Sequence, residues 1–246
     1  IPTCGTIVTG FVASNVDLIL ANATPALQAA ATATQTIPIL GTAVTEYGVA
    51  LDIKDFNGTV GGNISGTSDL APLDQQADML LELLPEAQNV GILYCSAEAN
   101  SVYQADVVKA ALEAKGVNVT VYTFADSNDV ATVTQTACAE NDALYIPTDN
   151  TAASCTEAIN NVAEPAGVPI VAGEEGICKG CGIATLSIDY YELGKTTGAM
   201  AAKILTGEAN VSEMPIEYYQ NPVKKYDAAR CEALGITVPA DYVAIG

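Results

Sequence analysis

Asp17-Leu-Ile-Leu-Ala-Asn-Ala-Thr-Pro-Ala26 is the stretch that decides the fold, because similar chemistry returns at Asp142-Ala-Leu-Tyr-Ile-Pro-Thr-Asp-Asn-Thr151. In each copy, an apolar run typical of a buried strand ends in a polar turn, and a helical pattern follows. Each copy then reaches a second apolar strand, at Ile37-Pro-Ile-Leu-Gly41 and at Val168-Pro-Ile-Val-Ala-Gly173. Two such α/β units predict two lobes that face each other, with the polar turns lining the cleft between them.

Composition excludes several classes of function. The net charge is −20 and only nine residues are Lys or Arg, which argues against nucleic acid as a partner, because phosphate binding needs basic side chains. No apolar stretch approaches the roughly 20 residues that span a bilayer. The chain has no histidine, which removes Ser-His-Asp and Cys-His catalysis and the commonest metal ligand. We therefore expect neither an enzyme nor a cofactor.

Seven cysteines are present, and one pair, Cys178-Lys-Gly-Cys181, forms a CxxC motif. A structural zinc site needs a second pair of similar spacing, and there is none in the sequence, so we expect no metal. The motif lies in the glycine-rich stretch Gly173–Gly182, which predicts a loop. A local disulfide and free thiols both remain open.

Strands alternate with helices along the chain, which predicts parallel sheets with helices on both faces. Ligands of such sheets bind beyond the carboxyl ends of the strands. Residues 58–69 are rich in glycine and hydroxyl groups and predict an extended segment that crosses between lobes. The predicted strands are Val16–Ala21, Ile37–Gly41, Val90–Tyr94, Val117–Phe124 and Ile183–Ile188, and the predicted helices are Pro25–Thr34, Pro72–Leu84, Ala99–Lys115, Val130–Glu140 and Tyr190–Thr206.

The turns of the first lobe are rich in donors. Thr24 before Pro25 predicts a helix N-cap whose free N–H groups favour an anion such as a ligand carboxylate. Ordinary capping is the alternative, and the two interpretations are compatible. Gly41-Thr-Ala-Val-Thr45 would offer hydroxyl and backbone donors to the same anion.

The turns of the second lobe are acidic. Asp149, Glu174 and Asp189 each follow a predicted strand, where a single carboxylate is usually a helix cap. Three of them opposite two hydroxyl-rich turns favour a ligand ammonium group. Donors in one lobe and acids in the other match a zwitterion.

The segment after residue 95 holds a third group of candidates. Asn100 or Ser101 is the predicted cap of the helix there, which leaves Glu98 and Tyr103 to reach a ligand. Tyr47, Tyr103 and Tyr190 lie near predicted cleft edges. They would flank an apolar or aromatic side chain, or pack at the solvent edge.

With these motifs in view, the chain resembles the substrate-binding protein family of ABC transporters, some of whose members take up aromatic amino acids. The resemblance runs from about residue 6 to the end. It rests on Val16-Asp-Leu-Ile-Leu-Ala21 with Thr24-Pro-Ala26, Gly41-Thr-Ala-Val-Thr45, Asn63-Ile-Ser-Gly-Thr-Ser-Asp69, Glu98-Ala-Asn-Ser-Val-Tyr-Gln104, Pro147-Thr-Asp-Asn150, Ala172-Gly-Glu174, Ile188-Asp-Tyr-Tyr-Glu-Leu-Gly194 and Ala228-Ala-Arg-Cys-Glu-Ala-Leu-Gly-Ile236.

The resemblance implies a type I periplasmic-binding fold of two Rossmann-like lobes. Lobe 1 would comprise residues 1–66 and 190–217, and lobe 2 residues 67–189 and 218–246. Carried over by position, Thr24, Ala43 and Thr45 would hold a ligand carboxylate, while Asp149, Glu174 or Asp189 would hold the amine. The full predicted ligand-binding set is Thr24, Ala43, Thr45, Ser68, Glu98, Asn100, Asp149, Asn150, Glu174, Asp189 and Tyr190.

The family further implies an extracytoplasmic protein, in the periplasm or as a cell-surface lipoprotein, that delivers an amino-acid-like ligand to the permease subunits of an ABC importer. Family members begin with an extra βαβ unit, so we expect lobe 1 to be incomplete. Three explanations remain open: the unit belongs to a part of the protein outside this sequence, it was removed by cleavage, or a second chain pairs with the Val16–Ala21 and Ile37–Gly41 strands to form a dimer. The start of the sequence, Ile1-Pro-Thr-Cys4, resembles an internal cut.

Two alternatives remain open. One is an extracellular amino-acid sensor module. The other is a two-lobed amino-acid racemase, which needs a thiol at the end of a strand in each lobe as acid and base. The matching positions, 21–24 and 148–150, contain no cysteine, and Cys95 alone cannot serve.

Overall fold

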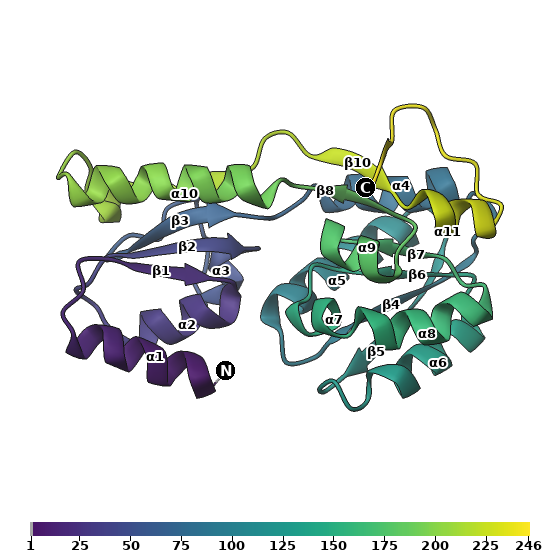
Figure 1. Cartoon of the computed structure of the whole chain (residues 1–246), viewed down its shortest axis with the longest axis horizontal. Coiled ribbons are helices and arrows are strands. Elements are labelled where there is room, and N and C mark those ends of the chain that lie inside the picture. Colours follow the sequence, from purple (N-terminus) through teal and green to yellow (C-terminus); the bar gives the residue numbers. More distant parts are fainter. Residues whose placement is uncertain (1) are drawn as a thin grey trace. The chain divides into compact units, whose positions relative to one another are not determined.

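The computed structural model describes residues 2–246, so Ile1, where the predicted lobe 1 begins, lies outside the described residues. Contacts divide the chain into two compact units, each of which is built from two segments. Unit 1 comprises Ile1–Leu70 and Asp189–Gln220, and unit 2 comprises Ala71–Ile188 and Asn221–Gly246. Each unit is an α/β sandwich (Figure 1).

Unit 1 contains a parallel sheet in the order β1-β2-β3-β9. Helices α1 and α2 cover one face of this sheet and α10 covers the other (Figure 1). The strands are β1 (Ile19–Asn22), β2 (Ile39–Val44), β3 (Ile64–Ser68) and β9 (Glu217–Tyr218), and the helices are α1 (Pro2–Ala13), α2 (Thr24–Ala33), α3 (Tyr47–Ala50), α10 (Tyr190–Leu205) and the 3-10 helix η1 (Val211–Glu213).

The core of unit 1 forms around Tyr47, which is fully buried and donates its hydroxyl to the Thr67 carbonyl at 3.1 Å. The ring fits because Gly41 on β2 and Gly66 on β3 have no side chain there, and a Cβ at either position would overlap the Tyr47 hydroxyl. The prediction that Tyr47 lies at a cleft edge is therefore wrong. The Tyr47 ring instead packs in the core, in the space left by two glycines on neighbouring strands.

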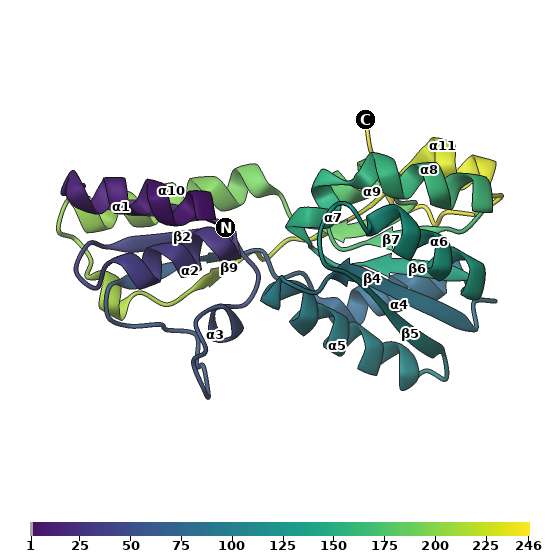
Figure 2. The same cartoon turned by 90° about the horizontal axis from the view of Figure 1, so that it is seen from below.

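Unit 2 contains a seven-stranded sheet in the order β11-β10-β8-β7-β6-β4-β5, in which only the pairing of β10 with β8 is antiparallel. Figure 2 shows α4 and α5 on one face, with α6, α8 and α9 on the other. The strands are β4 (Asn89–Cys95), β5 (Asn118–Phe124), β6 (Ala143–Ile146), β7 (Ile170–Ala172), β8 (Ala184–Ser187), β10 (Val223–Tyr226) and β11 (Val243–Ala244). The helices are α4 (Leu73–Leu83), α5 (Ala99–Glu113), α6 (Val130–Glu140), α7 (Asn150–Ser154), α8 (Thr156–Ala166), α9 (Glu175–Cys181) and α11 (Ala228–Ala233).

The order of strands in unit 2 reverses at β4. The chain moves outward from β4 to β5 and then returns to place β6 on the other side of β4. Such a reversal is a topological switch point, and doubly wound sheets bind ligands beyond the carboxyl ends of the two strands that flank it. Those ends lead into residues 96–98 and 147–150.

Several predicted elements differ from the structure. The helix α1 was not predicted, because its small and β-branched residues give weak helical periodicity. The segment 58–69 was predicted as a crossing, but five of its residues form β3 inside the sheet of unit 1. Its glycines and hydroxyls suit a strand that is buried on both faces. Among residues 2–246, no helix has both the length and the apolar character needed to cross a membrane.

The CxxC segment was predicted as a loop, but Glu175–Cys181 is helical, because Glu174 caps its first turn. Cys178 and Cys181 are both buried in the core of unit 2, and all seven cysteines are free thiols. Burial raises the pKa of the Cys181 thiol to about 12, which keeps that thiol protonated at neutral pH.

Candidate ligand-binding site

Asp149 lies at the switch point of unit 2, immediately before α7, and is almost completely buried. Its carboxylate accepts three hydrogen bonds, from the Cys95 amide at 2.8 Å, the Ser101 hydroxyl at 2.7 Å and the Ala152 amide at 2.7 Å. Asp149 therefore caps α7 and at the same time ties the end of β4 and the start of α5 to the end of β6. Ser101 was predicted to cap α5, but its hydroxyl points to Asp149 instead.

A second carboxylate, Glu98, approaches the start of α7 from the β4–α5 turn. One oxygen accepts from the amide and the side chain of Asn150 at 3.0 and 2.7 Å. The other accepts from the amide and the hydroxyl of Thr151 at 2.8 and 2.7 Å. The start of α7 therefore occupies both oxygens of Glu98, and a contact between Glu98 and a ligand stays a prediction.

The side-chain amides of Asn100 and Gln104 on α5 bind the backbone of Thr148, the residue before Asp149. Gln104 donates to the Thr148 carbonyl at 2.9 Å and accepts from the Thr148 amide at 3.1 Å. Asn100 also donates to the Thr148 carbonyl, at 3.0 Å. The Asn100 side-chain oxygen is buried and has no hydrogen-bond partner among the described residues, which makes it an unused acceptor in this cluster.

The two carboxyls have opposite pKa shifts. Burial, followed by the nearby charge of Glu98, raises the pKa of Asp149 to about 6, even though three hydrogen bonds oppose the shift. Burial also raises the pKa of Glu98, but the hydrogen bonds from Thr151 and Asn150 together outweigh it, so the net shift is downward. With these shifts both groups are anionic at neutral pH, and within residues 2–246 only neutral donors contact them.

The other two predicted amine partners are helix caps. Glu174 accepts from the Gly176 amide at 2.7 Å and from the Ile177 amide at the start of α9. Asp189 accepts from the amides of Tyr191 and Glu192 at 2.9 and 3.1 Å at the start of α10, and it belongs to unit 1. Glu174 neighbours the Asp149 turn in unit 2, because Gly173 packs directly against Thr148.

The corresponding edge of unit 1 has a strained backbone. Ala23 follows β1 with φ 74° and ψ 158°, a region that residues other than glycine rarely adopt, and Ala43 in β2 has φ 50°. Ala23, and not Thr24 as predicted, occupies the N-cap position of α2, and no side chain caps the helix. Pro25 has no N–H, and the Ala26 and Leu27 N–H groups donate to the Ala23 carbonyl, which leaves the Thr24 N–H at this end of the helix.

Hydroxyl groups hold the neighbouring strands of unit 1 together. The side-chain oxygens of Thr42, Thr67 and Thr197 form a closed triangle with distances of 2.8, 3.0 and 3.3 Å, which joins β2, β3 and α10. Ser68 donates to the Thr45 carbonyl at 2.8 Å, and the Thr45 side chain is buried. The Tyr190 hydroxyl donates to the Asp69 carboxylate at 3.0 Å.

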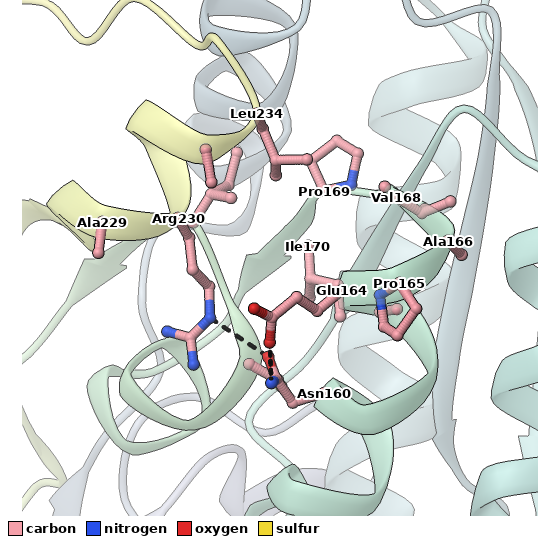
Figure 3. Close-up of a pocket in the computed structure, with 15 residues that line it drawn as sticks. Asn160, Glu164, Pro165, Ala166, Val168, Pro169, Ile170, Ala229, Arg230 and Leu234 are labelled. Carbon is pink, nitrogen blue, oxygen red and sulfur yellow. Dashed lines mark hydrogen bonds between the residues drawn. The ribbon is translucent and has the colours of Figure 1, made fainter.

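A separate cavity of about 380 Å³ lies in unit 2 between α8, α11 and the start of β7 (Figure 3). Arg230 points toward Asn160, which in turn contacts Glu164 (Figure 3). The guanidinium group of Arg230 also donates to the Asp227 carboxylate and to backbone carbonyls, so its charge is already compensated. None of the predicted ligand-binding residues lines this cavity.

The structure thus brings Glu98, Asn100, Asp149 and Asn150 together at one edge of unit 2, with Glu174 on the adjacent turn. It places Thr24, Ala43, Thr45 and Ser68 at the carboxyl ends of the strands of unit 1. Sequence reasoning missed the role of Gln104, although Glu98, Ser101 and Gln104 follow at intervals of three residues, which is the spacing of one helix face. Within residues 2–246, no group of three or more histidine, cysteine, aspartate or glutamate side chains could hold a metal ion.

Comparison with known proteins places the chain in a family. Residues 3–244 match the family described as ABC transporter substrate binding protein. The chain is 35% identical over 215 residues to a tyrosine-binding protein of Clostridioides difficile, covering 87% of this chain. The matched region spans 62% of the length of that relative.

Solved structures agree with this result. A domain from Streptococcus pneumonia in complex with L-Trp has a TM-score of 0.91 at 31% identity, covering 96% of this chain and 80% of that chain. A ligand-free, open substrate-binding protein with adhesive properties from Clostridium difficile has a TM-score of 0.73 at 34% identity, covering 100% and 84%. The chain belongs to the family of ABC transporter substrate-binding proteins and has their two-lobed α/β fold, as the sequence predicted.

Proposed function

We propose that this chain binds an amino acid with an aromatic side chain and delivers it to an ABC permease without catalysing a reaction on it. The proposal is supported most by the buried Asp149 at the switch point of unit 2, where the donors that contact the anionic carboxylate in the described part of the chain are all neutral. An ammonium group would supply the missing positive charge. The relatives that bind tyrosine and tryptophan support the aromatic amino-acid class.

The carboxylate of the ligand is assigned to unit 1. The start of α2 has no side-chain cap and offers the Thr24 N–H and the positive end of a helix dipole, because Pro25 has no N–H and the Ala26 and Leu27 N–H groups donate to the Ala23 carbonyl. We assign the side chains of Thr24 and Thr45 to the same carboxylate. In unit 2, Asn150 and Thr151 at the start of α7 already donate to Glu98 and Ala152 donates to Asp149, so that helix start is a poor anion site. By this contrast, unit 1 by itself offers groups for a carboxylate, and unit 2 by itself offers groups for an ammonium.

Isothermal titration calorimetry tests the proposal directly. We expect binding of tyrosine, tryptophan or phenylalanine. We also expect a loss of 2–5 kcal/mol with the matching deaminated acid and with the decarboxylated amine, since a buried charge would lose its partner in each case. Equal affinity for the amino acid and its deaminated analogue would contradict the role of Asp149. Tight binding of a sugar with no binding of amino acids would contradict the ligand class.

The partners and location follow from the same proposal. The protein would act on the extracytoplasmic side, in the periplasm or as a cell-surface lipoprotein, and would dock onto the transmembrane subunits of an importer. A dimer is also proposed. The prediction that a second chain pairs with the Ile37–Gly41 strand is wrong, because β2 already has β1 and β3 on its two sides. The strand β1 pairs only with β2 among the described residues, and Leu20 on it is 56% exposed beside Phe11 of α1. Light scattering that shows a monomer at all concentrations would contradict the dimer alone.

A further inference from the structure

The turn formed by residues 148–151 is held almost entirely by side chains from the start of one helix, α5. The amides of Thr148, Asn150 and Thr151 all donate to Gln104 or Glu98, and the Thr148 carbonyl accepts from Gln104 and Asn100. Glu98, Asn100 and Gln104 are themselves buried, so water does not compete for these bonds. The conformation of the turn therefore depends on α5 more than on its own sequence.

The carboxylates of Glu98 and Asp149 differ in how many further hydrogen bonds they can accept. An ionised carboxylate offers about four lone-pair sites. Glu98 uses four on Asn150 and Thr151, and Asn100 lies 3.4 Å from one of its oxygens as a fifth donor. Asp149 uses three, two on one oxygen and one on the other. Only Asp149 keeps a site that an additional donor could use.

We propose that Glu98 and Gln104 are positioning residues, which fix the 148–151 turn before the ligand arrives so that Asp149 retains one open acceptor site for the ligand's ammonium group. This inference rests on the proposed function. It assigns the ligand contact to Asp149 and removes it from Glu98. Amide exchange in the ligand-free protein separates the two roles, because a residue that contacts only the ligand has no influence on the turn when the ligand is absent.

The test uses the Glu98→Gln variant, which keeps the size of the side chain but turns amide donors toward the donors of Asn150 or Thr151. We expect hydrogen exchange of the amides at residues 148–152 to become at least tenfold faster without ligand. We also expect a rise of about 10- to 100-fold in the dissociation constant for the aromatic amino acid that the wild type binds, which is tyrosine, tryptophan or phenylalanine. Glu113→Gln is the matched control, because Glu113 lies on the same helix with its side chain exposed, and it should change neither value.

Gln104→Met provides an independent variant if Glu98→Gln does not fold, because it removes the bonds to Thr148 and leaves both carboxylates in place. It should also speed exchange at Thr148 and weaken binding. Unchanged exchange in both variants, or wild-type affinity in a variant whose turn has loosened, would overturn the positioning role. A wild-type protein that binds no amino acid would overturn the proposed function and this inference together.

Discussion

The two strand edges that carry the candidate ligand groups are built by different means. In unit 2, side chains hold the edge, since Asp149, Glu98 and Gln104 satisfy nearly every amide of the turn after β6. In unit 1, the backbone itself defines the edge, through positive φ angles at Ala23 and Ala43 and a helix start without a side-chain cap. One edge concentrates negative charge on buried carboxylates, and the other presents backbone donors.

This difference indicates how each edge should respond to substitution. The unit 2 edge should be sensitive to the loss of a single polar side chain, because each one leaves several buried groups without partners. The unit 1 edge should be sensitive to backbone freedom and less so to polar groups. Substitutions at matched positions in the two units test that contrast.

The largest effect is expected at Asp149. Asp149→Ala should lower the free energy of unfolding by about 3 kcal/mol, because two amides and the Ser101 hydroxyl lose a charged acceptor in a buried place. It should also abolish detectable amino-acid binding. Asp189→Ala removes only an exposed cap from α10 and should cost about 1 kcal/mol. Urea denaturation of both variants measures the difference, and equal losses would contradict the contrast between the edges.

The next effect concerns pH. The pKa of Asp149 is raised in the folded state to about 6, so protonation favours the folded state, and this contribution is complete below the unfolded value near 4 and is lost as pH rises through 6. When the pH falls from 7 to 4.5, the free energy of unfolding of the wild type should therefore rise by roughly 2 kcal/mol relative to that of Asp149→Asn. Glu98 has a lowered pKa, so its own contribution is present above its unfolded value and is lost only at lower pH.

Two features of the chain bear on whether this pH effect can be assigned to Asp149. The chain has no histidine that would titrate in the same window. Glu174 also has a raised pKa, mainly through burial, so the measurement needs Glu174→Gln as a parallel background. A stability difference between wild type and Asp149→Asn that stays flat from pH 7 to 4.5 in both backgrounds would show that Asp149 titrates normally.

Much of the fold could be predicted from the sequence, because buried parallel strands and amphipathic helices leave strong periodic patterns. The helix Val130–Glu140 was predicted to the residue, and α5 and α10 differ only at their ends. Two of the failures share a cause. The segments around β3 and α9 are rich in glycine, which predicted a crossing segment and a loop, but tertiary packing uses glycine for the close approach of Tyr47 at Gly66 and of Thr156 at Gly180.

The candidate site could be predicted less well. The types of residue were found, because carboxylates and hydroxyls that follow strands are visible in the sequence. Their partners were not, since the bonds from Glu98 to Asn150 and from Gln104 to Thr148 join residues that are more than 40 positions apart. A single sequence does not contain those pairings. Capping was considered for Asp149, Glu174 and Asp189, and each of them does cap a helix.

The cores of the two units each contain a buried tyrosine, and replacing either one by phenylalanine should have a smaller effect on stability than Asp149→Ala. In unit 2, the Tyr145 hydroxyl donates to the side-chain oxygen of the fully buried Gln76. Tyr145→Phe leaves that oxygen without this donor and should cost about 2 kcal/mol. In unit 1, Tyr47→Phe removes a single bond to the Thr67 carbonyl and should cost about 1 kcal/mol. Thermal unfolding monitored by calorimetry ranks the two, and a larger loss for Tyr47→Phe would reverse the comparison.

The smallest effect has the opposite sign and isolates the backbone of unit 1. Ala23 adopts φ 74° and ψ 158°, which glycine reaches without strain, so Ala23→Gly should raise the free energy of unfolding by up to about 1 kcal/mol. The same substitution at Ala29, in the middle of α2, should lower it by about 1 kcal/mol, because glycine loses more conformational freedom in a helix. The two alanines lie six positions apart in one chain, so a common solvent or expression effect cannot produce opposite signs.

If both substitutions destabilise equally, the strain at Ala23 does not exist, and the edge of unit 1 would have to be explained by its hydroxyl contacts alone. If Ala23→Gly stabilises the fold and at the same time weakens amino-acid binding, then the strained turn holds the Thr24 amide at the start of α2 in the orientation that the ligand carboxylate requires.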